Sequence, residues 1–242
     1  ARTATTAPTE TPPPTETPPS TGTSSPTAVP TPTPVPEPVT VYLPIAIRRV
    51  CKTGDVHTDV VLAIDASTSM LEASGDRTKL ERAQEAARAF VRLLDPGADQ
   101  AAVVSFSSEA RLDVPLSGDP TRVVQAIDGI VAGPGTHIHV ALELATAELE
   151  SGRARAGSNA VIVLMTDGRP ADGTVEATRA AADRAKGLGI ALYTIGLGDD
   201  VDADLLAALA SSADHYVAAP DAADLARIYS RIAGELPCPG GV

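Results

Sequence analysis

The chain is poor in aromatic and basic residues, and both shortages exclude classes of partner. It has no Trp and only two Phe among 242 residues, and its 31 acidic side chains outnumber 19 Lys and Arg to give a net charge of −12. A nucleic-acid interface needs bases that neutralise phosphates and rings on which nucleobases stack. Anionic membrane surfaces also attract basic segments. The composition therefore predicts no binding to nucleic acid and no attraction to anionic membranes.

Long apolar runs are absent as well. The sequence contains no run of about 18 apolar residues, which is the length that a membrane-spanning helix requires. We therefore expect no membrane insertion. The chain begins at Ala1, without a Met or a signal peptide, as expected of a mature or trimmed product.

Only two cysteines are present, and they flank the part of the chain that carries the apolar pattern. Cys51 precedes the first apolar run, and Cys238 follows the last helical pattern. They are either two free thiols or one disulfide that joins the ends of a domain, and the flanking placement favours the disulfide. Closing a loop of this size stabilises a domain by up to roughly 5 kcal/mol in the chain-entropy model. A disulfide indicates an oxidising compartment, so we expect a secreted or cell-surface protein.

The composition changes near residue 40. Of the 21 prolines, 12 lie in the first 38 residues, interleaved with Thr and Ser. This segment has few apolar side chains to bury, so we expect residues 1–40 to be a disordered spacer with extended polyproline II character. Its composition fits either an O-glycosylated stalk or an unmodified tail. We expect residues 41–54 to be an extended lead-in that contains Cys51, residues 55–238 to form one domain, and residues 239–242 to be a C-terminal tail.

Short apolar runs alternate with amphipathic patterns after residue 55. Strands are predicted at 60–64, 101–106, 110–114, 160–166, 190–196 and 215–217, and helices at 77–94, 119–131, 140–150, 175–188, 205–210 and 221–232. This alternation favours a mostly parallel sheet covered by helices on both faces. The link between 106 and 110 is too short for a parallel crossover, so one strand should be antiparallel at an edge. The sequence predicts a doubly wound α/β fold.

The first apolar run ends in Asp65-Ala66-Ser67-Thr68-Ser69, which presents one carboxylate and two hydroxyls. Hard oxygen ligands select Mg²⁺, Mn²⁺ or Ca²⁺, although a capped turn before a helix has the same residue types. Thr136 in a glycine-rich loop and Asp167 after the run 160–166 are further candidates. Ligands gather at the carboxyl ends of parallel strands, so we expect these residues to share one site.

In this order, the three segments resemble the von Willebrand factor type A family and its metal-ion-dependent adhesion site, in the bacterial secreted or surface type. The resemblance covers residues 55–235 and implies a Rossmann-like fold. It implies that Mg²⁺, or else Mn²⁺ or Ca²⁺, is bound by Asp65, Ser67, Ser69 and Thr136, with Asp167 close by or acting through water. It also implies a protein partner whose exposed Asp or Glu completes the coordination shell.

The loop after Thr136 departs from the family pattern. The family usually has Asn directly after this Thr and Gly two positions further on, where this chain has His137 and His139. Thr136 remains a predicted ligand, but we expect two imidazole side chains, a group that can titrate near neutral pH, to make the rim of the site bulkier. Ligation of the metal by a histidine is the alternative, and we favour ordinary rim histidines.

No catalytic arrangement is found in the sequence. Neither Ser67 nor Ser69 lies in a Gly-x-Ser-x-Gly elbow, and a hydroxyl bound to a metal is a poor nucleophile. The acidic segment 199–204 does not continue with the Gly and the carboxylate of a calcium loop, so it should cap a short helix. We therefore expect a non-enzymatic extracellular binding or adhesion module. The alternatives are a subunit of a surface filament or stalk in which the metal only stabilises, and a metal-assisted hydrolase.

Overall fold

The computed structural model describes residues 57–236. These residues belong to one of the two compact units into which the chain divides, residues 47–242, whereas the unit 1–46 lies outside the described residues. The predicted spacer, the lead-in, Cys51, Cys238 and the C-terminal tail also lie outside the described residues. The expectations for these segments therefore stay predictions.

A six-stranded sheet with the order β5-β4-β1-β6-β7-β8 forms the centre of the domain. The strands are β1 (Thr58–Asp65), β4 (Gln100–Phe106), β5 (Ala110–Ser117), β6 (Asn159–Thr166), β7 (Ala191–Leu197) and β8 (Tyr216–Ala219). Neighbouring strands pair in parallel, except that β4 and β5 are antiparallel. The predicted mostly parallel sheet with one antiparallel edge strand is confirmed.

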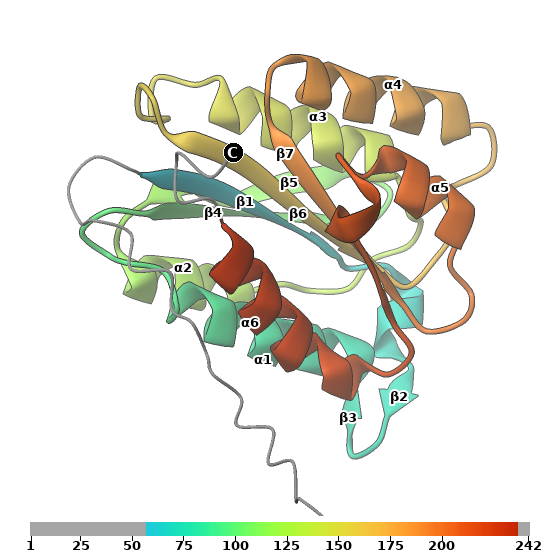
Figure 1. The fold of residues 1–242 in the computed structure, drawn as a ribbon. Coiled ribbons are helices and arrows are strands. Elements are labelled where there is room, and N and C mark those ends of the chain that lie inside the picture. Colours follow the sequence, from blue (N-terminus) through green and yellow to red (C-terminus); the bar gives the residue numbers. More distant parts are fainter. Residues whose placement is uncertain (1–56, 237–242) are drawn as a thin grey trace, which may run out of the picture. The chain divides into compact units, whose positions relative to one another are not determined.

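Helices cover both faces of this sheet (Figure 1). One face carries α1 (Lys79–Val91), α2 (Pro120–Asp128) and α6 (Leu225–Glu235), and the other carries α3 (Ile138–Leu149), α4 (Val175–Gly187) and α5 (Ala203–Leu209). Strand side chains alternate between faces, so Leu62 and Ile64 of β1 pack in the first core, and Val61 and Ala63 in the second. Within residues 57–236, none of the helices combines the length and the apolar character that crossing a bilayer demands.

The first helix begins later than predicted because a small hairpin precedes it. After the 3₁₀ helix η1 (Thr68–Leu71), β2 (Ala73–Ser74) pairs antiparallel with β3 (Arg77–Thr78). The hydroxyl of Thr78 accepts a hydrogen bond from the backbone N–H of Glu81, whose carboxylate accepts one from the N–H of Thr78. This capping box starts α1 at Lys79 and places that lysine close to the end of β1.

Other boundaries shift for similarly local reasons. The second helix ends at Asp128, before the C-cap residue Gly129, rather than at 131, and Val131 is 79% exposed. The last helical segment is divided, since Asp221 caps the 3₁₀ helix η3 (Ala222–Asp224) before α6 begins. The acidic turn after β7 caps α5, as predicted, because the Asp202 side chain accepts a hydrogen bond from the N–H of Leu205.

The carboxyl ends of β1 and β6 lie side by side in the middle of the sheet. From β1 the chain moves to β4 on one side, and from β6 it moves to β7 on the other, so the strand order reverses between β1 and β6. Open α/β sheets place their ligands at such a switch point. Asp65 is the last residue of β1, and Asp167 directly follows β6.

Candidate metal centre

The carboxylate of Asp65 is fully buried at the end of β1. Its Oδ1 accepts a hydrogen bond of 2.7 Å from the N–H of Ser67, and its Oδ2 accepts one from the hydroxyl of Thr166 at the end of β6. Burial raises the pKa of Asp65 to about 6; the hydrogen bonds from Thr166 and Ser67 oppose this rise, and the charge of Asp167 adds to it. A cation nearby would favour the ionised form of this buried carboxylate.

The two serines after Asp65 connect this loop to the β6 loop. The hydroxyl oxygens of Ser67 and Ser69 lie 2.9 Å apart, and Ser69 donates a hydrogen bond of 2.7 Å to Oδ1 of Asp167. The side chain of Asp167 has no exposed area. The end of β1 and the end of β6 therefore contribute to one hydrogen-bonded cluster of hydroxyls and carboxylates.

The loop that carries Thr136 closes the third side of this cluster. Ser67 forms an isolated parallel bridge with Gly133, so the two loops are joined through their backbones. A Cβ atom placed on Gly168, the residue after Asp167, would lie 3.7 Å from Oγ1 of Thr136. The hydroxyl of Thr136 thus faces the backbone of the β6 loop.

Gly135 allows this loop to approach the β4–β5 hairpin. Its φ is +83°, a left-handed conformation that residues with a side chain rarely adopt. A Cβ atom on it would lie only 3.2 Å from Cα of Ser108, whose N–H donates a hydrogen bond of 2.7 Å to the carbonyl of Pro134. A glycine is therefore required directly before Thr136, both for the backbone angle and for the contact.

The structure brings all five predicted metal-site residues to one edge of the sheet. Asp65, Ser67, Ser69 and Asp167 are linked by hydrogen bonds, and Thr136 adjoins them. Hydroxyl and carboxylate oxygens are the donors that Mg²⁺, Mn²⁺ and Ca²⁺ prefer. Over residues 57–236, no group of three or more His, Cys, Asp and Glu side chains is placed to hold a metal ion, so a cation here would need the hydroxyl oxygens beside the two carboxylates. These residues fit a hard divalent cation.

The two rim histidines lie at the start of α3. Nδ1 of His137 is 2.8 Å from the carbonyl oxygen of Ser108, and the rings of His137 and His139 have centroids 5.6 Å apart. One nitrogen of His137 is thus engaged by the β4–β5 hairpin. The predicted role of both histidines as rim residues stays a prediction.

Sequence reasoning missed two residues that contact the predicted ligands. The hydroxyl of Thr166 donates a hydrogen bond to Asp65, and Nζ of Lys79 lies 2.9 Å from Oδ2 of Asp167. Thr166 was within reach of prediction, because it precedes Asp167 in a Thr-Asp-Gly segment at the end of a buried run. Lys79 carried no such signal, since a lysine in the first turn of an amphipathic helix is ordinarily solvent-exposed.

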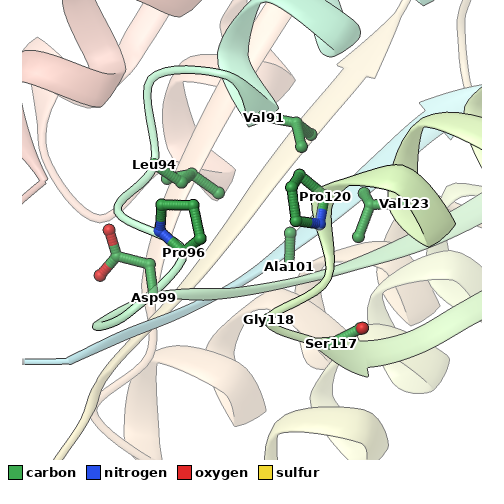
Figure 2. Close-up of a pocket in the computed structure, with 9 residues that line it drawn as sticks. All are labelled: Val91, Leu94, Pro96, Asp99, Ala101, Ser117, Gly118, Pro120 and Val123. Carbon is green, nitrogen blue, oxygen red and sulfur yellow. The ribbon is translucent and has the colours of Figure 1, made fainter.

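The apolar hollow in Figure 2 lies at the opposite edge of the sheet. It is bordered by the end of α1, the start of β4 and the start of α2, at Val91, Ala101 and Pro120. About 10 Å³ is open to the centre of a water molecule, so it holds roughly one water. A larger hollow of about 330 Å³ adjoins the metal centre beside Ala66 and Val131. Another, of about 250 Å³, lies at the β2–β3 hairpin beside Leu71 and Thr78.

Comparison of the sequence with known proteins gives the family. Residues 59–231 match the von Willebrand factor type A domain. Matrilin-1 of Mus musculus is 30% identical over 159 residues, which are 62% of this chain and 30% of that protein. Matrilin-4 of Homo sapiens is 30% identical over 200 residues, which are 78% of this chain and 30% of that protein. The chain therefore spans about 30% of the length of these curated relatives.

Solved structures share the fold at low sequence identity. Proximal thread matrix protein 1 from the mussel byssus, with a zinc-occupied MIDAS motif, has a TM-score of 0.65 at 22% identity, covering 75% of this chain and 46% of that one. A von Willebrand factor type A protein from Catenulispora acidiphila has a TM-score of 0.64 at 24% identity, covering 74% and 42%. With most of its length matched by the family, this chain is a member of the von Willebrand factor type A domain family.

Proposed function

We propose that this domain is an extracellular binding or adhesion module in which a divalent cation is the recognition element. The observation that supports it most is the hydrogen-bonded cluster in which Ser69 connects Ser67 to the buried Asp167. When bound, Mg²⁺, or else Mn²⁺ or Ca²⁺, would supply a Lewis-acidic point with a position open to a carboxylate oxygen.

Each residue of the centre has a proposed part in holding that cation. Ser67, Ser69 and Thr136 would offer hydroxyl oxygens, and Asp65 would offer its charge directly. Asp167 would act through water. The hydrogen bonds that Asp65 accepts from Ser67 and Thr166 fix its carboxylate in one orientation, and a carboxylate has further lone pairs with which to meet a cation.

The proposed partner is a protein that presents an exposed Asp or Glu. Because the chain has a net charge of −12, a broadly acidic partner would be repelled, and a neutral or locally basic surface with one accessible carboxylate fits best. Two structures of the same fold are named as a pilus adhesin of Lactobacillus rhamnosus GG and a pili tip protein of Porphyromonas gingivalis, which supports an adhesive role. We propose a secreted or cell-surface location, with residues 1–40 as a spacer.

A structural role is the second candidate, since another protein of this fold is named as a thread matrix protein. In that role the cation would only stabilise the domain by offsetting two buried carboxylates. A metal-assisted hydrolase is the third and least supported interpretation, and the absence of enzyme activity stays a prediction. Turnover in a broad hydrolase screen would be needed to support the hydrolase interpretation.

The experiment is a capture assay with the full chain immobilised and a native surface proteome as the source of partners. The adhesion proposal predicts proteins that are retained in Mg²⁺, released by EDTA and not retained by Asp65→Ala. The variant must keep the wild-type circular dichroism spectrum, so that loss of capture is not loss of folding. Retention that is equal in Mg²⁺ and in EDTA would contradict the adhesion proposal, and a cation-dependent melting temperature without any capture would favour the structural role.

A further inference from the structure

Lys79 places an ammonium group against the candidate metal centre. Its Nζ lies 2.9 Å from Oδ2 of Asp167 and 2.7 Å from Oε2 of Glu72. The Lys79 side chain is 19% exposed and that of Asp167 is fully buried. The other oxygen of Asp167 accepts the hydrogen bond from Ser69, so a single carboxylate joins Lys79 to the hydroxyls of the centre.

The backbone holds Lys79 in this place. The capping box formed by Thr78 and Glu81 fixes the start of α1 at Lys79. The N–H of Lys79 also donates a hydrogen bond of 3.0 Å to the carbonyl of Glu72. Glu72 therefore contacts both the backbone and the side chain of Lys79. An ordinary surface lysine, by contrast, samples many rotamers and contributes little through its ion pairs.

The formal charges of the buried groups show what this ammonium does. Asp65 and Asp167 together carry two negative charges, and Lys79 reduces the charge of these protein groups to −1. A divalent cation then makes the centre +1, and one carboxylate from a partner neutralises it. Without Lys79 the loaded centre would already be neutral, and the same carboxylate would make it −1. Glu72 is left out of this count because its side chain is 65% exposed and screened by water.

We propose that Lys79 sets the charge of the centre and positions Asp167, so that the domain binds its cation less tightly and an acidic partner more tightly. The inference rests on the proposed function, since it requires a divalent cation at this site. Lys79 occupies Oδ2 of Asp167 while Oδ1 faces Ser69. Asp167 is thereby kept from turning to chelate the cation, and the cation keeps a position for the carboxylate of a partner.

The test is Lys79→Met in the full chain, with two calorimetric titrations. The first adds Mg²⁺ or Ca²⁺ to metal-free protein, and we expect the variant to bind roughly tenfold more tightly, a change of the size produced by one nearby charge. The gain should be larger for Ca²⁺, which takes more carboxylate oxygens than Mg²⁺. The second adds acetate, as a carboxylate probe, to protein saturated with Mg²⁺, and there the variant should bind several-fold more weakly.

Two controls separate this role from a merely structural one. Lys79→Arg keeps the charge and should restore both affinities to near the wild-type values. Lys186→Met makes the same change of net charge at the end of α4, where Lys186 pairs with Asp183, and should change neither affinity. Lys79→Gln replaces the methionine variant if that variant does not fold.

The outcomes distinguish this inference from the proposed function. If the wild-type chain and the lysine variants all fail to bind a divalent cation, the proposed function and the inference are both wrong. If the wild-type chain binds a cation but folded Lys79→Met binds it no more tightly, or binds acetate as well as before, only the role of Lys79 is wrong. Equal behaviour of Lys79→Met and Lys79→Arg would also overturn it. Opposite changes in the two affinities, restored by arginine, would support it.

Discussion

Ser69 and Asp167 are separated by 98 positions in the sequence, and Ser69 donates a hydrogen bond of 2.7 Å to Oδ1 of Asp167. The contact exists because β1 and β6 are parallel neighbours whose carboxyl ends coincide. The candidate metal centre is therefore a product of strand order. Its proposed ligands come from three loops, which the parallel sheet brings to one edge.

The buried charge of Asp65 should destabilise the metal-free domain at neutral pH. Burial raises the pKa of Asp65 from 3.8 to about 6, so the folded state takes up a proton more readily than the unfolded chain. The penalty is complete above the folded pKa and disappears as the pH falls from about 6 to below 3.8. Asp65→Asn should raise the free energy of unfolding at pH 7 in EDTA by up to about 3 kcal/mol.

Urea unfolding at pH 7 and at pH 4 measures this effect. Most of the gain should vanish at pH 4, where the wild-type carboxyl is already protonated in the folded state. The prediction is wrong if Asp65→Asn is no more stable than the wild type at pH 7, or if its gain is the same at both pH values.

Gly135→Ala should disturb the metal centre from outside its ligands. The substitution is strained by the φ of +83° and places Cβ 3.2 Å from Cα of Ser108, so the loop with Thr136 must move. We expect a loss of about 1–3 kcal/mol in the free energy of unfolding and a weaker affinity for Mg²⁺. Thermal melting and calorimetry measure the two effects.

Gly157→Ala is the matched control for this change. Gly157 has a similar φ of +79°, but an added Cβ would meet nothing within 4 Å. Gly157→Ala should lower the free energy of unfolding because the backbone angle is strained, but it should leave the affinity for Mg²⁺ unchanged. An equal loss of Mg²⁺ affinity in both variants would contradict the role given to the Gly135 loop.

The ion pair of Arg155 with Asp59 should contribute strongly to stability. Asp59 is fully buried and accepts hydrogen bonds from the backbone and the guanidinium of Arg155 and from Ser158. Burial alone would raise the pKa of Asp59, but the hydrogen bonds from Arg155 and Ser158 and the charge of Arg155 together outweigh it and hold the pKa below 3.8. This stabilisation is present above 3.8 and is lost as the pH falls through the lower, folded value.

Arg155→Met should lower the free energy of unfolding at pH 7 by roughly 3 kcal/mol, because it leaves a buried carboxylate without its cation. Arg184→Met, which removes an exposed pair with Glu150, is the control and should cost about 1 kcal/mol or less. Chemical denaturation of both variants decides the matter. Similar losses in the free energy of unfolding of the two variants would show that the buried Asp59 pair stabilises the domain no more than an exposed pair does.

Cys51 and Cys238 are expected to form one intramolecular disulfide. Both residues lie outside the described part of the chain, so their placement at the two ends of the domain is the whole basis of the prediction. Intact mass after alkylation, with and without reductant, tests this prediction. Two thiols that react in the unreduced protein would exclude the disulfide. If the disulfide is present, its reduction should lower the melting temperature without abolishing the metal site.

The fold was predictable because each buried strand is a short apolar run and each helix an amphipathic one. Asp65 and Asp167 were placed correctly at strand ends for the same reason, since both directly follow such runs. The sequence did not predict which side chains from distant parts of the chain contact each other. Lys79 reaches Asp167 only because the β2–β3 hairpin and the capping box at Thr78 set the start of α1, and these depend on a few local hydrogen bonds.

The most direct test of the account is calorimetric titration of Mg²⁺ into the EDTA-stripped full chain. We expect one Mg²⁺ site in the wild type, no binding in Asp65→Ala and a smaller loss of affinity in Asp167→Asn, because the side chain at position 167 would act through water. Circular dichroism must show that both variants are folded. A wild-type chain without a site, or Asp65→Ala with unchanged affinity, would contradict the assignment of this cluster as a metal centre.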